Sequence, residues 1–413
     1  MNMNAIAAMT VLAEDTAAVR EKLRDNPNRV YFPNFGSGDN ILREGIDIDR
    51  IAFTVPGTNF NIYWYGLLIG IGILLAMIYG YRKMRPCGID PDRATDGVIG
   101  GVIGSILGAR LYYIVFNTEG LTIADFFKIR NGGLALYGAL IGAILVGGII
   151  TKLRGLRLSA MLDVAAPCFF IGQCIGRWGN FFNQEAFGAN TDKPWGMLSW
   201  KTALFINEHY DTLTEVDAYS PIHPCFLYES LWCLAGFLIL HFYFKHRKFD
   251  GEIFIMYAGW YGLGIFFIEG LRTDSLYLGN IRVSQLVAGT CVLAAIILWI
   301  FFFNYTRRSG SYKFFYETEL SKAQLEEYAS YEDLQKERKE LKKKISEAKH
   351  KGESFAELEK EYEEKFGKEA AKARKQALKD AAGKDKEQEE KPDEDYTSIL
   401  ADDEDEDESE SDS

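Results

Sequence analysis

Long apolar stretches alternate with short polar connections along the first 305 residues. Seven of them approach the roughly 20 residues that a helix needs to cross the hydrocarbon core of a bilayer. They are residues 62–80, 95–116, 132–151, 159–176, 224–244, 251–270 and 282–303. Most lack the polar face of a helix in a soluble protein, which disfavours a large soluble protein with seven buried helices. The pattern predicts an all-α polytopic membrane protein, a bundle of seven transmembrane helices.

Basic residues follow the odd-numbered spans. Arg82 and Lys83 come after the first span and Arg307 and Arg308 after the seventh, and the third and fifth are followed by similar groups. The alternate loops are poorer in Lys and Arg for their length. Because Lys and Arg concentrate in cytoplasmic loops, we expect the N-terminus outside and the C-terminus in the cytoplasm. The long connection between spans 4 and 5, about residues 177–223, is then an external loop region.

Charge divides the chain of 413 residues further. The net charge is −12, and residues 306–413 carry 22 basic and 33 acidic side chains, so the rest is almost neutral. We expect an external N-terminal arm (1–60), a transmembrane domain (61–305) and a cytoplasmic charged tail (306–413). In the tail, Glu and Lys alternate over about 317–381, which predicts a solvated helix, and DDEDEDESESDS predicts an acidic disordered end.

The predicted tail has no evident chemistry. We expect that removing it after about Arg308 leaves the membrane domain active, and the sequence points to no particular partner for it. A basic patch with interleaved aromatic residues is also missing from the sequence, so nucleic-acid binding is not predicted.

Ionisable side chains inside the predicted spans are candidate functional residues, because charges at membrane depth cost several kcal/mol unless they are paired or hydrated. Most of them fall near the external ends of the spans, which predicts a polar cavity that opens toward the outer leaflet. These residues are Arg110, Asp163, Arg177, Glu185, Glu229, Glu269 and Arg272.

The densest polar segment is GRWGNFFNQEAFG, residues 176–188. It holds Arg177, Gly179, Asn180, Asn183 and Glu185 around a predicted helix end. A guanidinium is a planar fork that matches phosphate oxygens, and Asn side chains can orient a hydroxyl group. The alternative is that Arg177 and Glu185 pair with each other and fix a loop.

A second polar group lies at the external end of the sixth span. Glu269 and Arg272 are three residues apart and share a helix face, so Arg272 could bring a second positive charge near Arg177. The alternative is an arginine at the membrane interface with a local salt bridge.

Two tyrosines at predicted span entrances are further candidates. Tyr137 enters the third span, and Tyr65 lies in the aromatic group at the start of the first. The alternatives are a packed, hydrogen-bonded Tyr137 and an interfacial aromatic belt around Tyr65. The six cysteines have no CxxC spacing and the five histidines are dispersed, so we expect neither a metal site nor a cofactor.

The segment GRWGNFFNQEAFG closely resembles the signature of the bacterial prolipoprotein diacylglyceryl transferases. The resemblance extends, in the family's order, to YWYGLLIG, GARLYYIVFN, NGGLALYGALIG, HPCFLYES and IEGLRTDS. It covers about residues 50–305, and leaves the N-terminal arm and the tail outside.

The resemblance implies a reaction at the bacterial cytoplasmic membrane, the first step of lipoprotein maturation. The lipobox cysteine thiol of a prolipoprotein attacks the glyceryl carbon that bears the phosphate of phosphatidylglycerol. A thioether forms and glycerol phosphate leaves, without a metal or cofactor.

The resemblance also implies roles for the candidate residues. Arg177 would bind the lipid phosphate, and Arg272 would stabilise the charge on the departing phosphate. Asn180, Asn183 and Glu185, with Gly179 between them and Arg177, would orient the headgroup glycerol. Glu269 would position Arg272.

Tyr137 departs from the family pattern, since many members have His at this position. A phenol with a pKa near 10 is a poor base at neutral pH, so we expect a positioning role for Tyr137, shared with Tyr65, and leave the thiol-activating base open. A transporter would favour repeated halves, which the sequence lacks, and a scaffold acting through its tail would leave Arg177 and Arg272 unexplained.

Overall fold

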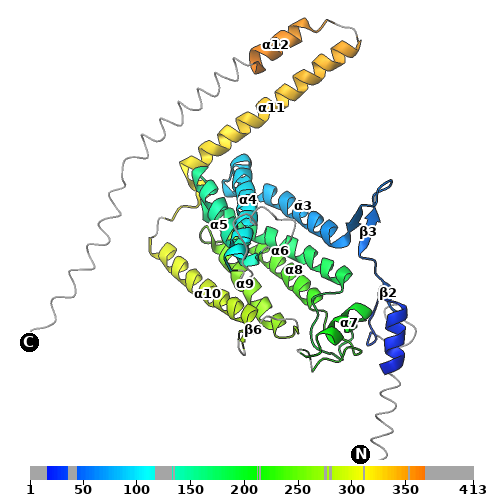
Figure 1. Cartoon of the computed structure of the whole chain (residues 1–413). Helices are drawn as coiled ribbons and strands as arrows, with labels where there is room; N and C mark the ends of the chain where they lie inside the picture. Colours follow the sequence, from blue (N-terminus) through cyan, green and yellow to red (C-terminus); the bar gives the residue numbers. More distant parts are fainter. Residues whose placement is uncertain are drawn as a thin grey trace, which may run out of the picture. The chain divides into compact units, whose positions relative to one another are not determined.

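The computed structural model is rich in helices, drawn in chain order in Figure 1. It describes residues 16–35, 44–116, 133, 135–211, 213, 215–273, 277–278, 281–309, 312–351 and 354–367. The chain divides into two compact units, Met1–Glu326 and Glu327–Ser413. The apolar helices among these residues lie in the first unit.

Within the described residues, six helices are long and apolar enough to cross a membrane. They match the first, second and fourth to seventh predicted spans, so the prediction of an all-α polytopic membrane protein is confirmed. Their bounds are Trp64–Met84 (α3), Pro91–Phe116 (α4), Leu158–Asn183 (α6), Cys225–Tyr243 (α8), Glu252–Glu269 (α9) and Val283–Ser309 (α10). The third predicted span corresponds to α5, Leu136–Leu153, a shorter apolar helix.

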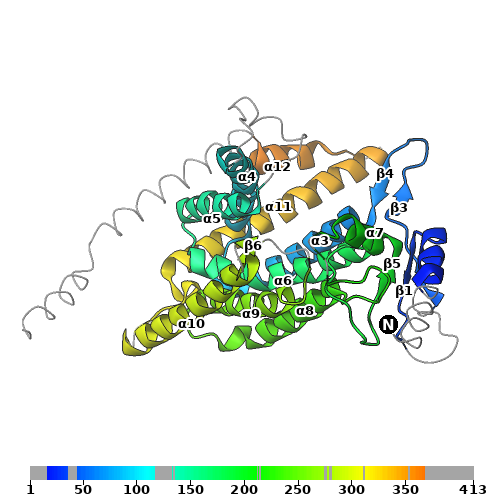
Figure 2. The same ribbon diagram turned by 60° about the horizontal axis from the view of Figure 1, so that its bottom comes forward.

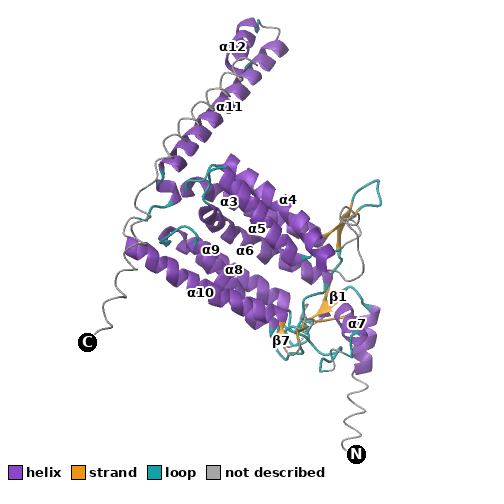
Figure 3. Cartoon of the chain, turned by 60° about the vertical axis from the view of Figure 1, so that its left-hand side comes forward, coloured by secondary structure: helices purple, strands orange, loops and turns teal. Residues whose placement is uncertain are grey.

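The apolar helices lie side by side in a bundle (Figure 3). α4 packs along α5, α3 along α6, and α9 along α10, while α6 also contacts α8 and α9. Large apolar side chains remain exposed on the outer faces; on α10, Leu293, Ile297 and Phe301 follow one another at a four-residue spacing. An exposed apolar surface of this kind suits hydrocarbon rather than water.

The two ends of the bundle differ. We call the "signature end" the one where α6 and α9 finish and α3 and α8 begin. At the opposite end, the "basic end", α3, α5, α8 and α10 finish with Lys, Arg or His in their last turns.

A small α/β domain covers the signature end (Figure 2). Its sheet has the order β2-β1-β5, all antiparallel: Ile46–Asp47, Arg29–Tyr31 and Leu198–Ser199. α7, Trp200–Glu208, follows β5. Leu23 and Val30 from the N-terminal arm share one core with Phe187, Met197 and Ile206. The arm therefore contributes β1, β2 and core side chains such as Leu23 to this domain.

Two short hairpins complete the signature end. β3 (Ile51–Thr54) pairs with β4 (Asn61–Tyr63), which leads directly into α3. β6 (Tyr277–Leu278) pairs with β7 (Ile281–Arg282), which leads into α10. The hairpins thus fix where both helices start.

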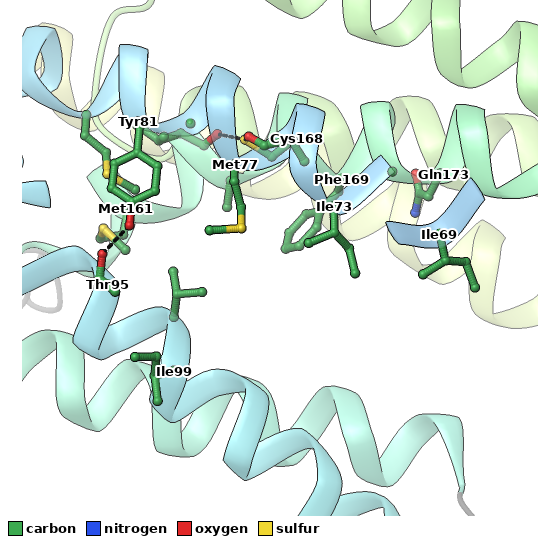
Figure 4. Close-up of a pocket in the computed structure, with 17 residues that line it drawn as sticks. Ile69, Ile73, Met77, Tyr81, Thr95, Ile99, Met161, Cys168, Phe169 and Gln173 are labelled. Atoms are coloured by element: carbon green, nitrogen blue, oxygen red, sulfur yellow. Dashed lines mark hydrogen bonds between the residues drawn. The ribbon is translucent and has the colours of Figure 1, made fainter. Parts of the chain in front are cut away.

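An apolar cavity of about 700 Å³ lies between α3, α4 and α6. Figure 4 shows Ile73 and Met77 of α3, Ile99 of α4 and Phe169 of α6 around it. Near the basic end the hydroxyl groups of Tyr81 and Thr95 join α3 to α4 at 2.7 Å. The cavity is lined mainly by side chains that would suit lipid.

The second unit consists of helices in its described residues. α11 (Glu319–Lys351) begins in the first unit and is followed by α12 (Ala356–Phe366). The two helices are joined by a Lys365–Glu337 ion pair and by an Arg338–Tyr362 hydrogen bond of 3.0 Å. The helix predicted over 317–381 is therefore two helices as far as 366. Residues 368–413, with the acidic end, lie outside the described residues.

Candidate active site

The polar segment of residues 176–188 forms the last two turns of α6 and the reversal after it. The helix ends at Asn183. The next residue, Gln184, has a left-handed backbone (φ 56°), and Ala186 repeats this conformation (φ 58°). Left-handed backbone costs a non-glycine residue roughly 1–2 kcal/mol. The turn therefore depends on its surroundings, including the hydrogen bond from Glu185 N to Asn180 O, 2.9 Å.

Two arginines and two glutamates meet beside this helix end and form what we call the "arginine cluster": Arg177, Glu229, Glu269 and Arg272. Arg177 Nη2 pairs with Glu229 Oε2. Arg272 Nη1 lies 3.6 Å from Glu229 Oε1 and 3.9 Å from Glu269 Oε2. The Glu229 side chain is 3% exposed, against 25% for Arg177 and 21% for Arg272. One buried carboxylate therefore bridges two guanidinium groups that remain partly accessible.

Backbone hydrogen bonds bring together the three segments that carry the cluster. Gly188 N donates to His223 O (2.8 Å), Phe226 N to Ala186 O (3.1 Å), and Ala189 N to Leu271 O (3.0 Å). A Cβ atom on Gly188 would lie 2.5 Å from Leu271 O, so the close approach of these two segments requires glycine. The end of α6, the start of α8 and the end of α9 are thereby held in fixed register.

His223 stands at the start of α8 within this framework. Its Nδ1 lies 2.8 Å from the Tyr228 hydroxyl. Burial, with a smaller effect of the Lys193 charge, lowers the pKa of His223. The imidazole is therefore neutral near pH 7.

A second group, the "asparagine cluster", consists of Arg50, Asn183, Glu185 and Lys201. Arg50 Nε donates to Asn183 Oδ1 (3.3 Å), and Asn183 Nδ2 donates to Glu185 Oε2 (3.4 Å). Lys201 donates to the Asn183 carbonyl oxygen, and its Nζ lies 3.8 Å from Glu185 Oε1. Burial, and then the nearby Arg50 charge, lower the pKa of Lys201.

The candidate residues of the segment are thus divided. Glu185 pairs with Lys201, whereas Arg177 pairs with Glu229. Asn183 lies six residues after Arg177, which is about 9 Å along a helix and on a different face. Asn180, three residues after Arg177, shares the face of Arg177.

Tyr65 and Gly179 meet between α3 and α6. A Cβ atom on Gly179 would lie 2.5 Å from Tyr65 Cδ2. Next to this contact the rings of Trp64 and Phe182 stack with centroids 4.9 Å apart. The absence of a side chain at Gly179 therefore lets the start of α3 lie directly on the last turns of α6.

Tyr137 belongs to neither cluster. It lies in the first turn of α5 and is 45% exposed. α5 packs mainly along α4, and at Gly138 its backbone approaches the carbonyl oxygen of Gly108. The structure thus places Tyr137 on a helix pair separate from the one that carries Arg177.

Sequence reasoning missed several partners. Glu229 is an acid within a predicted span for which the sequence suggests no role. Tyr261 of α9, which lies close to Arg177, does not stand out among the other tyrosines of the apolar spans. Arg50 and Lys201 were also missed. Two arginines at one end of a bundle do predict a buried acid nearby, which could have pointed to Glu229.

Metal ligands are not grouped in the part of the chain that the structure describes: no three His, Cys, Asp or Glu side chains there could hold an ion together. The described site is built from arginines, carboxylates, amides and phenols. Fold and site together define a class: a helical multi-pass membrane protein with a carboxylate-bridged arginine pair at one end of its bundle.

Comparison with known proteins identifies the family. Residues 50–301 match a sequence family described as prolipoprotein diacylglyceryl transferase. The chain belongs to this family, as its signature predicted, and is therefore a transferase of lipoprotein biosynthesis.

Three relatives from bacteria are each named phosphatidylglycerol–prolipoprotein diacylglyceryl transferase. The protein of Finegoldia magna is 39% identical over 256 residues, which is 61% of this chain and 95% of the relative. The protein of Clostridium novyi is 40% identical over 255 residues, which is 61% of this chain and 95% of the relative. The protein of Bacillus cereus ATCC 14579 is 40% identical over 255 residues, which is 61% of this chain and 92% of the relative.

Proposed function

We propose that this protein transfers the diacylglyceryl group of phosphatidylglycerol to the lipobox cysteine of prolipoproteins. A carbon–sulfur bond forms at the glyceryl carbon, and the bond between this carbon and the phosphate oxygen breaks. The thiol proton goes to a base, and glycerol phosphate leaves. The observation that carries the proposal is the arginine cluster, in which Arg177 and Arg272 share one buried carboxylate beside the signature segment.

The two arginines recognise the phosphate. Arg177 binds the phosphodiester, and Arg272 stabilises the negative charge that develops as the phosphate departs, because guanidinium groups match phosphate oxygens and act strongly where water is scarce. Glu229 keeps the two positive groups together before the lipid arrives. Glu269, three residues before Arg272, positions it.

The remaining residues orient the headgroup and the attacking thiol. Asn180 faces the headgroup from the same side of α6 as Arg177, and Asn183 and Glu185 contact the glycerol from the neighbouring turn. Gly179 allows Tyr65 to line the site, and Tyr137 contributes from α5. No residue is assigned as the base.

We further propose seven spans, with α5 as the third, in the bacterial cytoplasmic membrane. The 18 residues of α5 make a helix of about 27 Å, close to the hydrocarbon thickness of about 30 Å. The N-terminus is outside and the C-terminus in the cytoplasm, because basic residues gather at the basic end. The signature end then meets both the outer leaflet and an exported lipobox cysteine.

The test is incubation of the purified full-length protein with phosphatidylglycerol and a lipobox peptide, followed by mass spectrometry. We expect the peptide to gain one diacylglyceryl group and glycerol phosphate to be released. Arg177→Ala and Arg272→Ala should abolish turnover, while Arg24→Ala, an exposed arginine of the arm, should not. Absence of the adduct with folded protein contradicts the reaction, and full activity of either cluster variant contradicts the phosphate assignment.

A further inference from the structure

After α10 the chain returns across the basic end of the bundle. Residues 312–326, which we call the "clasp", contain the short 3₁₀ helix Phe315–Glu317 and the first two turns of α11. They lie beyond the residues that match the family, 50–301. Nevertheless Phe315, Ser321 and Gln324 are almost fully buried, with Ser321 at 0% exposure.

The first turns of α11 hold two loops at once. Ser321 Oγ donates to the carbonyl oxygen of Gly88, in the α3–α4 connection, at 2.7 Å. Gln324 Nε2 donates to the carbonyl oxygen of Gly155, in the α5–α6 connection, at 3.3 Å. Gly88 has a left-handed backbone (φ 77°), and a Cβ atom there would lie 2.5 Å from Tyr316 Cα. The α3–α4 loop is therefore shaped to receive the clasp.

A third loop, between α8 and α9, meets the clasp through charges. Asp250 Oδ2 accepts hydrogen bonds from Phe315 N (2.7 Å) and from Arg157 Nη1 (2.8 Å). The guanidinium of Arg247 lies over the ring of Phe314, 5.2 Å from its centroid. The Asp250 side chain is almost fully buried. The clasp therefore both donates a hydrogen bond to this carboxylate and shields it from solvent.

These loops join the helices that line the apolar cavity. Gly88 lies in the loop that joins α3 to α4, and α6 begins shortly after Gly155. α4 faces α3 and α6 across the cavity (Figure 4), with the Tyr81–Thr95 hydrogen bond near the basic end. Whatever fixes both loops therefore fixes the separation of α4 from α3 and α6.

We propose that the clasp is an integral part of the membrane domain: it ties the three loops together and, through them, keeps α4 close to α3 and α6, so that the cavity stays closed at the basic end although no clasp residue lines it. The domain thus extends to about residue 326, and the removable tail starts after it. The proposal rests on the contacts of the clasp and does not depend on the transferase reaction.

Cys87 provides a direct test, because it is buried in the same apolar cluster as Phe315. A variant that keeps Cys87 and has the other five cysteines replaced by Ala is reacted with a maleimide in detergent. The full chain and a truncation after Ser330 should react at the same slow rate. Truncation after Arg308 should accelerate labelling at least tenfold.

A point variant serves as a control, because the truncated protein could label faster simply by misfolding. Phe315→Asp in the full chain should also accelerate labelling of Cys87, whereas Phe366→Asp in α12 should not. Slow labelling in both Phe315→Asp and the truncation after Arg308 would overturn the proposal. Fast labelling of the truncation after Ser330 would overturn the assignment to residues 312–326.

The cavity is tested separately with Cys168, which lines it. In a variant that keeps only Cys168, loss of the clasp should raise the labelling rate severalfold. An unchanged rate, together with exposed Cys87, would show that the clasp covers the loops without closing the cavity. This result would overturn the second half of the proposal.

Discussion

Replacing Glu229 by Gln tests the arginine cluster most directly. Gln has nearly the same shape but no charge, so Arg177 and Arg272 would face each other without the carboxylate between them. At the 3.6 Å separation of Arg272 Nη1 and Glu229 Oε1, one such pair is worth about 4–5 kcal/mol at an effective dielectric constant of 20. Part of this is offset by the desolvation that the charges no longer require.

We expect a net loss of about 3–5 kcal/mol in the free energy of unfolding, the usual cost of breaking a buried ion pair by removing one partner. With an unfolding entropy of about 2.1 cal/mol/K per residue, each kcal/mol shifts the unfolding temperature of this 413-residue chain by about 1 °C. The lipid-free Glu229→Gln variant should therefore unfold roughly 3–6 °C below the wild type in detergent.

An anionic headgroup should reverse much of this loss. A phosphodiester placed between the two arginines replaces the missing negative charge, so saturating phosphatidylglycerol should raise the unfolding temperature of Glu229→Gln more than that of the wild type. Phosphatidylcholine at the same concentration is the control for bulk lipid. A lipid-induced shift no larger than in the wild type, or destabilisation below about 0.5 kcal/mol, would refute the reasoning.

The remaining predictions concern single contacts of the site. Gly179→Ala should lower turnover at least tenfold because its Cβ would meet the Tyr65 ring, whereas Gly176→Ala on the same helix, where a Cβ meets open space, should not. Adding Tyr65→Ala should restore the unfolding temperature of Gly179→Ala. Failure to restore it would contradict the role of the ring contact. Arg272→Lys keeps the charge but loses the planar fork, so turnover should fall by at least tenfold while lipid still stabilises the protein, and wild-type kinetics would contradict a bidentate role. Because burial lowers the pKa of His223, the unfolded chain binds more protons than the folded one as pH falls below about 6.5. Stability should decrease there, and His223→Gln should flatten that part of a pH–unfolding curve.

The spans could be predicted because their hydrophobicity is continuous and local. α5 is harder to recognise as a span than the others. Leu136–Leu153 is shorter than α4 and α6, which precede and follow it in the chain, because the segment before it is polar and glycine-rich. The β-strands of the N-terminal arm escaped prediction because Arg29–Tyr31 and Ile46–Asp47 are too short for a two-residue alternation to emerge.

The site could be predicted where its residues are neighbours in the chain. Arg177, Asn180 and Asn183 stand out in one segment, but their partners Glu229 and Lys201 come from other helices. Which partner each polar group meets depends on how the helices pack, which apolar patterns do not specify. The division into two clusters therefore needed the structure.

The clasp illustrates another limit of sequence patterns. Charge composition places the start of the tail near Arg308. Phe315, Ser321 and Gln324 are single buried positions in a charged region, and an average over many residues hides them.

The place of β1 in its sheet has a consequence for the order of folding. β1 is the middle strand, and one of its neighbours, β5, follows about 170 residues later. Contacts between such distant segments form late, because a long loop must close first. During synthesis β1 emerges before α3 to α6, so the edge that pairs with β5 stays unpaired until those helices have been made. β1 is thus made early but completes its sheet late.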